Sequence, residues 1–445
     1  MPTKLTGTIP QPVAVSVEYG GVGQEMPNAS WLWTAAQIAE ERAPGAKSFR
    51  PDKALTSLCE WFATKEALVT VLPPNGRVDA VDRVLPYALA WQQDRDLIVI
   101  APRMAVGTTL ERLAWIQTPV AVFTYDENVL VEAAVIPARA EVLAAARERR
   151  PRLTAAHDVA DSRNLVAALL DWADGHWALS RASRASYLAW HCLGRQVLAI
   201  RRTDGGIRVT AGVKHVGAGS TSDGVFDEPL TESVSAVQRS LIEAAVAAAV
   251  ADRYTGVDAG HVEHRMQGAL AASRLAPLGV DRFVREYPAW RGLGRQGFID
   301  FLGVDRRNRL HVVETKVGTD DPGVVLQTVD YATWVRANAT EIRDNLGWPM
   351  HGGNDEPVID IVLAPKQAGG QAIGPYLAGQ LEALSRDLYW RVYVIVDPRS
   401  EVLEVLGPLD CLPMPDTLPG VRVASPVVRP RWPARAAAEL AQKAT

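Results

Sequence analysis

The feature that most constrains this chain is a pair of apolar segments that carry three charged residues. The first segment, 297–304, contains Asp300, and the second, 310–317, contains Glu314 and Lys316. Both have the length and the apolar content of buried strands, and the residues between them are polar, as in a turn. The sequence therefore predicts a β-hairpin with charged side chains inside its strands.

The register of this hairpin brings the charges together. If Val304 pairs with Leu310, Asp300 lies directly opposite Glu314, with Cβ atoms about 4.5–5.5 Å apart. Alternate residues of a strand share a face, so Lys316 joins the same patch. Two opposed carboxylates destabilise a sheet unless a cation lies between them, and hard divalent cations prefer carboxylate oxygens.

This pattern predicts a site for Mg²⁺ or Mn²⁺ held by Asp300 and Glu314. Such an ion polarises a phosphoryl oxygen and activates water, and Lys316 could orient that water or stabilise the reacting phosphorus. The alternative is an exposed hairpin with a surface ion pair. The lysine usage favours the site, because the chain has eight lysines against 39 arginines. Of these lysines, Lys316 alone follows an acidic residue by two positions.

An Asp followed by Glu-Thr-Lys on adjoining strands resembles the PD-(D/E)XK nuclease superfamily. The resemblance covers about 230–400, and Asp300, Glu314 and Lys316 fall on its motif positions, with Ile299 where many members have proline. It implies a restriction-endonuclease-like core, a mixed sheet flanked by helices. The expected element order agrees: helices at 231–253 and 261–275, strands at 283–288, 297–304 and 310–317, a helix at 322–338, a strand at 357–364, a helix at 374–388 and a strand at 389–396.

Two more residues extend the resemblance on the helix that follows the hairpin. Gln327 and Tyr331 lie four residues apart and therefore share a helix face. The pair is similar to the Gln-x-x-x-Tyr motif of RecB-type nucleases, which implies that both side chains face the catalytic site. Alternatively, Tyr331 packs in the core and Gln327 is solvated.

A third carboxylate is expected from the helix before the strands. The segment 262–270 resembles the first helix of NucS-like and Shedu-like nucleases, which implies that Glu263 completes the catalytic and metal-binding set. Glu243 and Glu286 are rival candidates, and any of the three could be an ordinary surface acid.

The rest of the chain divides into further segments. Residues 1–150 are expected to form a small α/β domain with a partly parallel sheet, which regulates the nuclease or selects its substrate. Residues 151–225 are expected to form a helical-hairpin module and a linker, 226–407 the nuclease domain, and 408–445 a proline-rich tail. Arginines and aromatic residues alternate through 165–213, which favours either a nucleic-acid surface or core aromatics with solvated arginines.

Composition limits the location and the partners. The net charge of −4 excludes a globally basic nucleic-acid binder. The three cysteines, Cys59, Cys192 and Cys411, lack metal-ligand spacing and are too few for a disulfide framework. The N-terminus has no apolar core of signal-peptide length, and the chain has no apolar run of 18 residues. We therefore expect a cytoplasmic protein without a membrane partner.

Together these patterns predict an α/β multidomain protein that is a Mg²⁺- or Mn²⁺-dependent nuclease, hydrolysing phosphodiester bonds of DNA as an endonuclease or exonuclease. RNA is not excluded as a substrate, and a homo-oligomer is expected from the superfamily. The domain organisation suggests bacterial defence or DNA processing. Two alternatives remain: a catalytically silent nucleic-acid-binding or scaffold protein on the same fold, and a nuclease gated by a nucleotide signal bound to the N-terminal domain.

Overall fold

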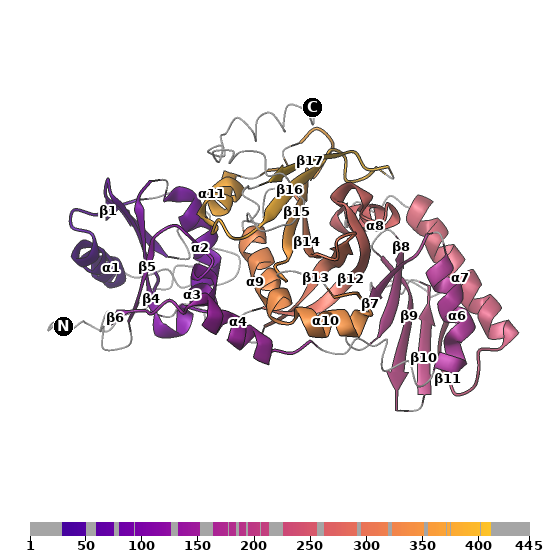
Figure 1. Cartoon of the computed structure of the whole chain (residues 1–445). Coiled ribbons are helices and arrows are strands. Elements are labelled where there is room, and N and C mark those ends of the chain that lie inside the picture. Colours follow the sequence, from indigo (N-terminus) through magenta and orange to yellow (C-terminus); the bar gives the residue numbers. More distant parts are fainter. Residues whose placement is uncertain are drawn as a thin grey trace. The chain divides into compact units, whose positions relative to one another are not determined.

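The computed structural model describes most of the chain between residues 29 and 410 (Figure 1). The described residues are 29–49, 59–74, 80–92, 94–125, 132–151, 163–176, 178–183, 187–192, 195–204, 206–212, 226–255, 262–291, 295–318, 323–350, 355–370, 372–373, 375–400 and 402–410. Cys411, most of the expected linker and most of the proline-rich tail lie outside them. Two compact units share the chain: unit 1 is Met1–Val142 with Gly374–Asp387, and unit 2 is Leu143–Ile373 with Leu388–Thr445.

Unit 1 contains a mixed sheet in the order β1-β2-β3-β4-β5-β6. Its strands are β1 (Lys47–Ser48), β2 (Glu60–Ala63), β3 (Ala67–Val71), β4 (Asp96–Pro102), β5 (Val120–Tyr125) and β6 (Glu132–Ala133). Its helices are α1 (Ala29–Arg42), α2 (Ala80–Trp91), η1 (Arg103–Ala105), α3 (Thr109–Leu113) and α11 (Pro375–Ala383). Helix α4 (Arg139–Glu148) starts in unit 1 and ends in unit 2. The three central strands are parallel, which confirms the predicted α/β sheet. Every residue of β3 is buried, as expected for a central parallel strand.

Unit 2 contains a second mixed sheet, with described strands in the order β11-β10-β9-β8-β7-β12-β13-β14-β15-β16-β17. The strands are β7 (Ser180–Ser183), β8 (Leu188–Cys192), β9 (Arg195–Thr203), β10 (Gly206–Ala211), β11 (Phe226–Leu230), β12 (Val280–Arg291), β13 (Arg295–Asp305), β14 (Leu310–Val317), β15 (Val358–Ala364), β16 (Trp390–Ile395) and β17 (Val405–Asp410). The helices are α6 (Arg163–Gly175), α7 (Ala236–Thr255), α8 (Val262–Ala272), η2 (Ala276–Leu278), α9 (Val324–Ala337) and α10 (Ala339–Leu346). Strands β14, β15 and β16 are parallel, and β12, β13 and β14 are antiparallel.

The expected helical hairpin within 151–225 is wrong. Helix α6 is present, but the segment after it forms strands β7 and β8, which continue into the β9–β10 hairpin. All five residues of β8 are buried. A strand covered on both faces has no polar alternation, so periodicity alone does not separate it from a buried helix.

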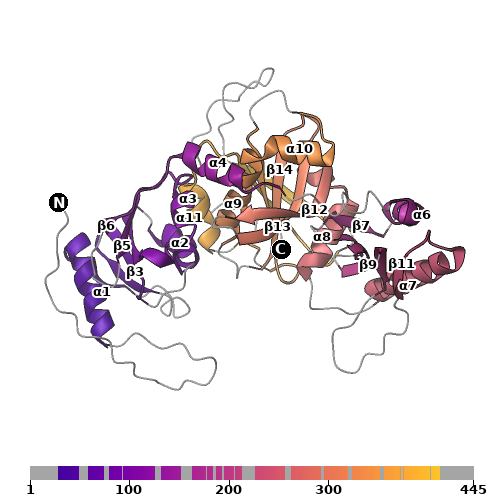
Figure 2. The same ribbon diagram turned by 90° about the horizontal axis from the view of Figure 1, so that it is seen from below.

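Helices α6 and α7 cover one face of strands β8 to β11 (Figure 2). Val166 and Leu169 of α6 and Ile242 of α7 pack in one core with Trp190 and Val209 of the sheet. Trp190 is fully buried and its indole donates to Asp174. The sequence left open whether Trp190 lies at a nucleic-acid surface or in the core, and the structure places it in the core.

The predicted register of the β13–β14 hairpin is confirmed. Val304 pairs with Leu310, and the pairing extends to Phe301 with Val313. Strand β14 lies between two helices: Val313 packs in a core with Met266 of α8, whereas Glu314 contacts Gln327 of α9. Because alternate side chains of a strand point to opposite faces, α8 and α9 cover opposite faces of the sheet.

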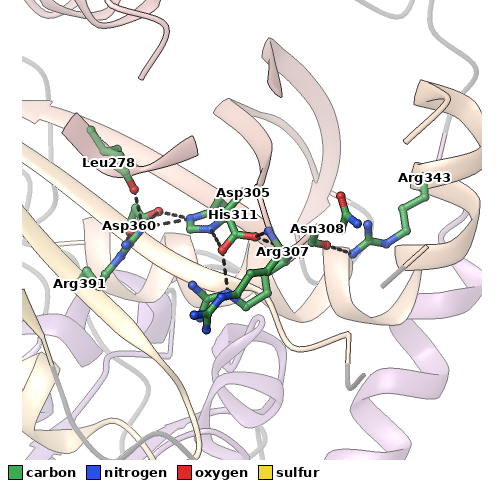
Figure 3. Close-up of polar contacts among 9 residues, drawn as sticks. Leu278, Asp305, Arg307, Asn308, His311, Arg343, Asp360 and Arg391 are labelled. Atoms are coloured by element: carbon green, nitrogen blue, oxygen red, sulfur yellow. Dashed lines mark hydrogen bonds and ion pairs between the residues drawn. The ribbon is translucent and has the colours of Figure 1, made fainter. Parts of the chain in front are cut away.

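A buried polar network fixes the turn end of this hairpin (Figure 3). His311 of β14 lies 2.7 Å from Asp360 of β15 and 3.6 Å from Asp305 of β13. Arg391 of β16 donates to both oxygens of Asp360, at 2.6 and 2.9 Å. Four neighbouring strands are therefore joined by side chains as well as by their backbones.

Among the residues that the structure describes, no helix combines the length and the apolar character that crossing a membrane requires.

Candidate active site beside strands β13 and β14

Asp300 lies one residue before the paired part of β13, at the end of the hairpin opposite to the turn. Its Oδ2 accepts two hydrogen bonds from Thr315, from the backbone N–H at 2.8 Å and from the hydroxyl at 2.7 Å. The side chain of Asp300 thus ties β13 to β14 just beyond the last backbone pair, Phe301 with Val313.

Glu314 lies next to Asp300 and is 1 % exposed. Its Oε2 accepts a hydrogen bond from the Gln327 amide at 3.1 Å, and its Oε1 lies 3.4 Å from the backbone nitrogen of Asp300. Gln327 comes from α9, so the helix after the hairpin orients this carboxylate. Of the two arrangements expected for Gln327, the structure has the one that faces the carboxylates.

Lys316 is placed beside Glu263, the predicted third carboxylate. The Lys316 ammonium lies 3.4 Å from Glu263 Oε1, and Glu263 Oε2 lies 3.4 Å from the backbone nitrogen of Val317. Neither rival takes this place. Glu243 pairs with Arg239 on its own helix, and the Glu286 carboxylate lies 3.7 Å from His191.

Tyr331 is buried, yet it stays within electrostatic reach of the carboxylates. Burial raises the pKa of its hydroxyl, and the charges of Glu314 and Asp300 raise it further. The Arg291 guanidinium lies over the Tyr331 ring, 5.6 Å from its centre, and 3.7 Å from Asp330. Both sequence interpretations of Tyr331 therefore hold in part, because it packs in the interior beside the charged cluster.

The three carboxylates Glu263, Asp300 and Glu314, which we call the carboxylate cluster, resist ionisation. Burial raises the pKa of Glu314 well above its usual value, and the charge of Asp300 adds to this effect. Burial also raises the pKa of Asp300, although hydrogen bonds from Thr315 and the charge of Lys316 oppose it. The pKa of Glu263 is raised in the same way, with Lys316 opposing burial. A cation placed among these groups would be favoured.

The donor set fits a hard divalent cation. Mg²⁺ binds through one or two carboxylates and keeps several waters for itself or for substrate phosphates. Asp300 and Glu314 supply two carboxylates. Among the described residues, no group of three or more His, Cys, Asp and Glu side chains is gathered as a metal site, and Glu263 is engaged by Lys316. The pair Asp300 and Glu314 is thus the candidate ligand set.

The arginines of the β13–β14 turn do not belong to this site. Asp305 lies five positions after Asp300, which is about 16 Å along a strand. Arg309 is held at the turn by Asp305, with its Nε 2.8 Å from Oδ2. Arg309 thus lies at the opposite end of the hairpin from Lys316.

Three residues of the site were missed by sequence reasoning. Thr315 stands between Glu314 and Lys316, in the variable position of the motif. Gln267 lies one turn after Glu263 on α8, and its amide donates to the Thr315 hydroxyl at 2.8 Å. Arg291 ends β12, far from the motif in sequence. The helical spacing of Glu263 and Gln267 was the one available signal.

Comparison with known proteins adds no assignment: no protein-family model, curated protein or solved structure matches this chain.

Proposed function

We propose that this chain is a metal-dependent nuclease that hydrolyses phosphodiester bonds of DNA on a restriction-endonuclease-like core. The proposal is carried by the convergence of Asp300, Glu314 and Lys316 with Glu263 and Gln327 from two flanking helices. The order α8–β12–β13–β14–α9–β15 supports it, with α10 inserted between α9 and β15, because the core of the superfamily that the sequence resembles has a helix, three strands, a helix and a strand.

Asp300 and Glu314 would hold Mg²⁺ or Mn²⁺. When bound, such an ion polarises a phosphoryl oxygen and lowers the pKa of water. Gln327 orients Glu314 by donating to Oε2, which keeps that carboxylate from rotating. Thr315 does the same for Asp300. Both acids are therefore presented in fixed directions, as a preorganised site requires.

Two cations of the chain complement an anionic substrate. Lys316 carries its ammonium beside the carboxylate cluster, where it can donate to negative charge that develops on a phosphoryl oxygen. Arg291 is partly exposed, and its charge lowers the pKa of Glu314, so it acts within the same electrostatic field. A phosphodiester brings the negative charge that these two side chains would bind.

The test is cleavage of supercoiled and linear DNA by the wild type and by Glu314→Gln, with Mg²⁺, Mn²⁺ or EDTA. We expect metal-dependent cutting by the wild type. Changing a residue that only orients a metal ligand typically costs 10–100-fold, so loss of a ligand should lower the rate by more than about 100-fold. Glu243→Gln makes the same chemical change on α7, in a partly exposed pair with Arg239, and should cut normally.

Three results would contradict the proposal in different ways. Cutting that survives in Glu314→Gln places the chemistry elsewhere. Cutting of RNA and not DNA in the same assay overturns the substrate class. Metal-dependent binding of DNA without cutting of either polymer favours the catalytically silent alternative.

A further inference from the structure

The Asp300 carboxylate is held by a chain of hydrogen bonds that begins on helix α8. One oxygen, Oδ2, receives both the backbone N–H and the hydroxyl of Thr315. The Thr315 oxygen in turn lies 2.8 Å from the Gln267 amide nitrogen. Thr315 has no exposed surface and Gln267 is 4 % exposed, so bulk water does not compete for these groups.

The direction of each hydrogen bond follows from counting protons. A threonine hydroxyl has one proton to donate, while an amide nitrogen donates and a carboxylate accepts. With Gln267 donating to Thr315, the hydroxyl proton points at Asp300 and all three groups are satisfied. With the amide reversed, its oxygen and Asp300 would compete for one proton, leaving a buried acceptor without its donor.

We propose that Gln267 and Thr315 are positioning residues that hold Asp300 so that its other oxygen, Oδ1, is presented to a divalent cation. This inference rests on the proposed function. Helix α8 would then have two roles, because Gln267 acts on Asp300 through Thr315 and Glu263, one turn earlier, pairs with Lys316. A single helix thereby positions the acid of β13 and the lysine of β14.

The test measures Mn²⁺ binding by electron paramagnetic resonance in the full-length protein, without substrate. Thr315→Val keeps the shape of the side chain and removes the hydroxyl. We expect Mn²⁺ to bind about 10-fold or more weakly in this variant, the usual effect of losing a group that orients a ligand. Thr315→Ser retains the hydroxyl and should bind within about threefold of the wild type.

A second variant tests the proton direction. Gln267→Glu replaces a donor by an acceptor of equal size, so the Thr315 hydroxyl turns from Asp300 to the new carboxylate. Mn²⁺ binding should weaken at least as much as in Thr315→Val. Gln267→Met removes the donor without adding an acceptor, and its effect should be smaller than that of Gln267→Glu.

The control is Thr333→Val on α9, which removes a hydroxyl that donates to the Val329 carbonyl. It should leave Mn²⁺ binding unchanged. If Thr315→Val lowers the melting temperature and binds Mn²⁺ like the wild type, Thr315 is merely structural and the inference is overturned. If the wild type itself binds no Mn²⁺, the proposed metal site falls, and the inference falls with it.

Discussion

At the scale of single residues, Gly297 shows how closely the candidate site is packed. A Cβ atom built on Gly297 would collide with the Tyr331 hydroxyl and lie 3.4 Å from Cδ of Arg291. Glycine is therefore required here for the approach of the Tyr331 side chain. The Arg291 guanidinium lies over the Tyr331 ring. The position of this ring therefore also places a cation beside the carboxylate cluster.

We predict that Gly297→Ala destabilises the protein by about 1–3 kcal/mol, the usual cost of forcing an extra methyl group into a packed interior. Denaturant unfolding measures the effect. Adding Tyr331→Phe removes the colliding oxygen, so the double variant should recover part of the loss. Gly175→Ala is the matched control, since an added Cβ there has no neighbour within 4 Å. Equal losses from Gly297→Ala and Gly175→Ala would contradict the steric argument.

The contacts of the candidate site could be predicted from the sequence only where the two partners are close together in the chain. Asp300 and Glu314 could be paired from the sequence because a hairpin fixes register by simple counting. Gln327 could be suggested from its helical spacing with Tyr331. Gln267 could not be assigned, because its contact with Thr315 spans 48 residues and depends on how α8 packs on the sheet.

At the scale of elements, the buried network of Asp305, His311, Asp360 and Arg391 specifies the pairing of β13 to β16. A slip of one residue would reverse the side of every side chain in a strand. It would also separate His311 from Asp360, leaving buried charges without partners, which is strongly unfavourable. The network at the turn end therefore protects the register on which the opposed Asp300 and Glu314 depend.

We predict that stability falls as pH rises above neutrality, through His311. Burial alone would lower the pKa of His311, but Asp360 and Asp305 outweigh it and raise the pKa. A raised folded-state pKa gives stability that is complete below the unfolded value of about 6.5 and is lost as pH passes the folded value. The free energy of unfolding, measured at pH 6, 7 and 8, should decline more steeply in the wild type than in His311→Gln.

His311→Gln is also expected to cost about 3–5 kcal/mol at pH 6, because it breaks a buried pair. Parallel pH profiles for the two proteins would show that His311 does not carry the dependence. Thr333→Val removes an uncharged hydroxyl from α9, so it serves as the control and should leave the slope unchanged.

Element types were predictable where a pattern was unambiguous. Strand β14 has the predicted limits, 310–317, because a polar turn precedes it and its apolar run is continuous. The sequence around β8 predicts a helix because all five residues of this strand are buried, which removes the polar alternation that marks a strand. Pairing of β7 with β12 joins residues about 100 positions apart, which no local pattern records.

At the scale of the whole molecule, helix α11 packs in a different unit from the strands that precede and follow it in the sequence. It connects β15 to β16 of unit 2 along the chain, yet it belongs to unit 1. The Tyr376 ring lies 4.9 Å from Tyr87 and 5.8 Å from Trp91 of α2. Gly379 allows close packing, because a Cβ there would lie 2.6 Å from Cα of Ala90.

We therefore predict that a polypeptide ending at Val142 does not fold stably, because the aromatic face of α2 loses its cover. Joining 374–387 to its C-terminus through a flexible linker should restore a cooperative unfolding transition. Gly379→Val in the fused protein is the matched negative control, since the larger side chain separates α11 from α2. Thermal unfolding followed by circular dichroism compares the three polypeptides. If the short polypeptide unfolds as cooperatively as the fused one, α11 is dispensable for unit 1. If fusion restores folding and Gly379→Val abolishes it, unit 1 is built from two distant parts of the chain, and the link between β15 and β16 depends on its integrity.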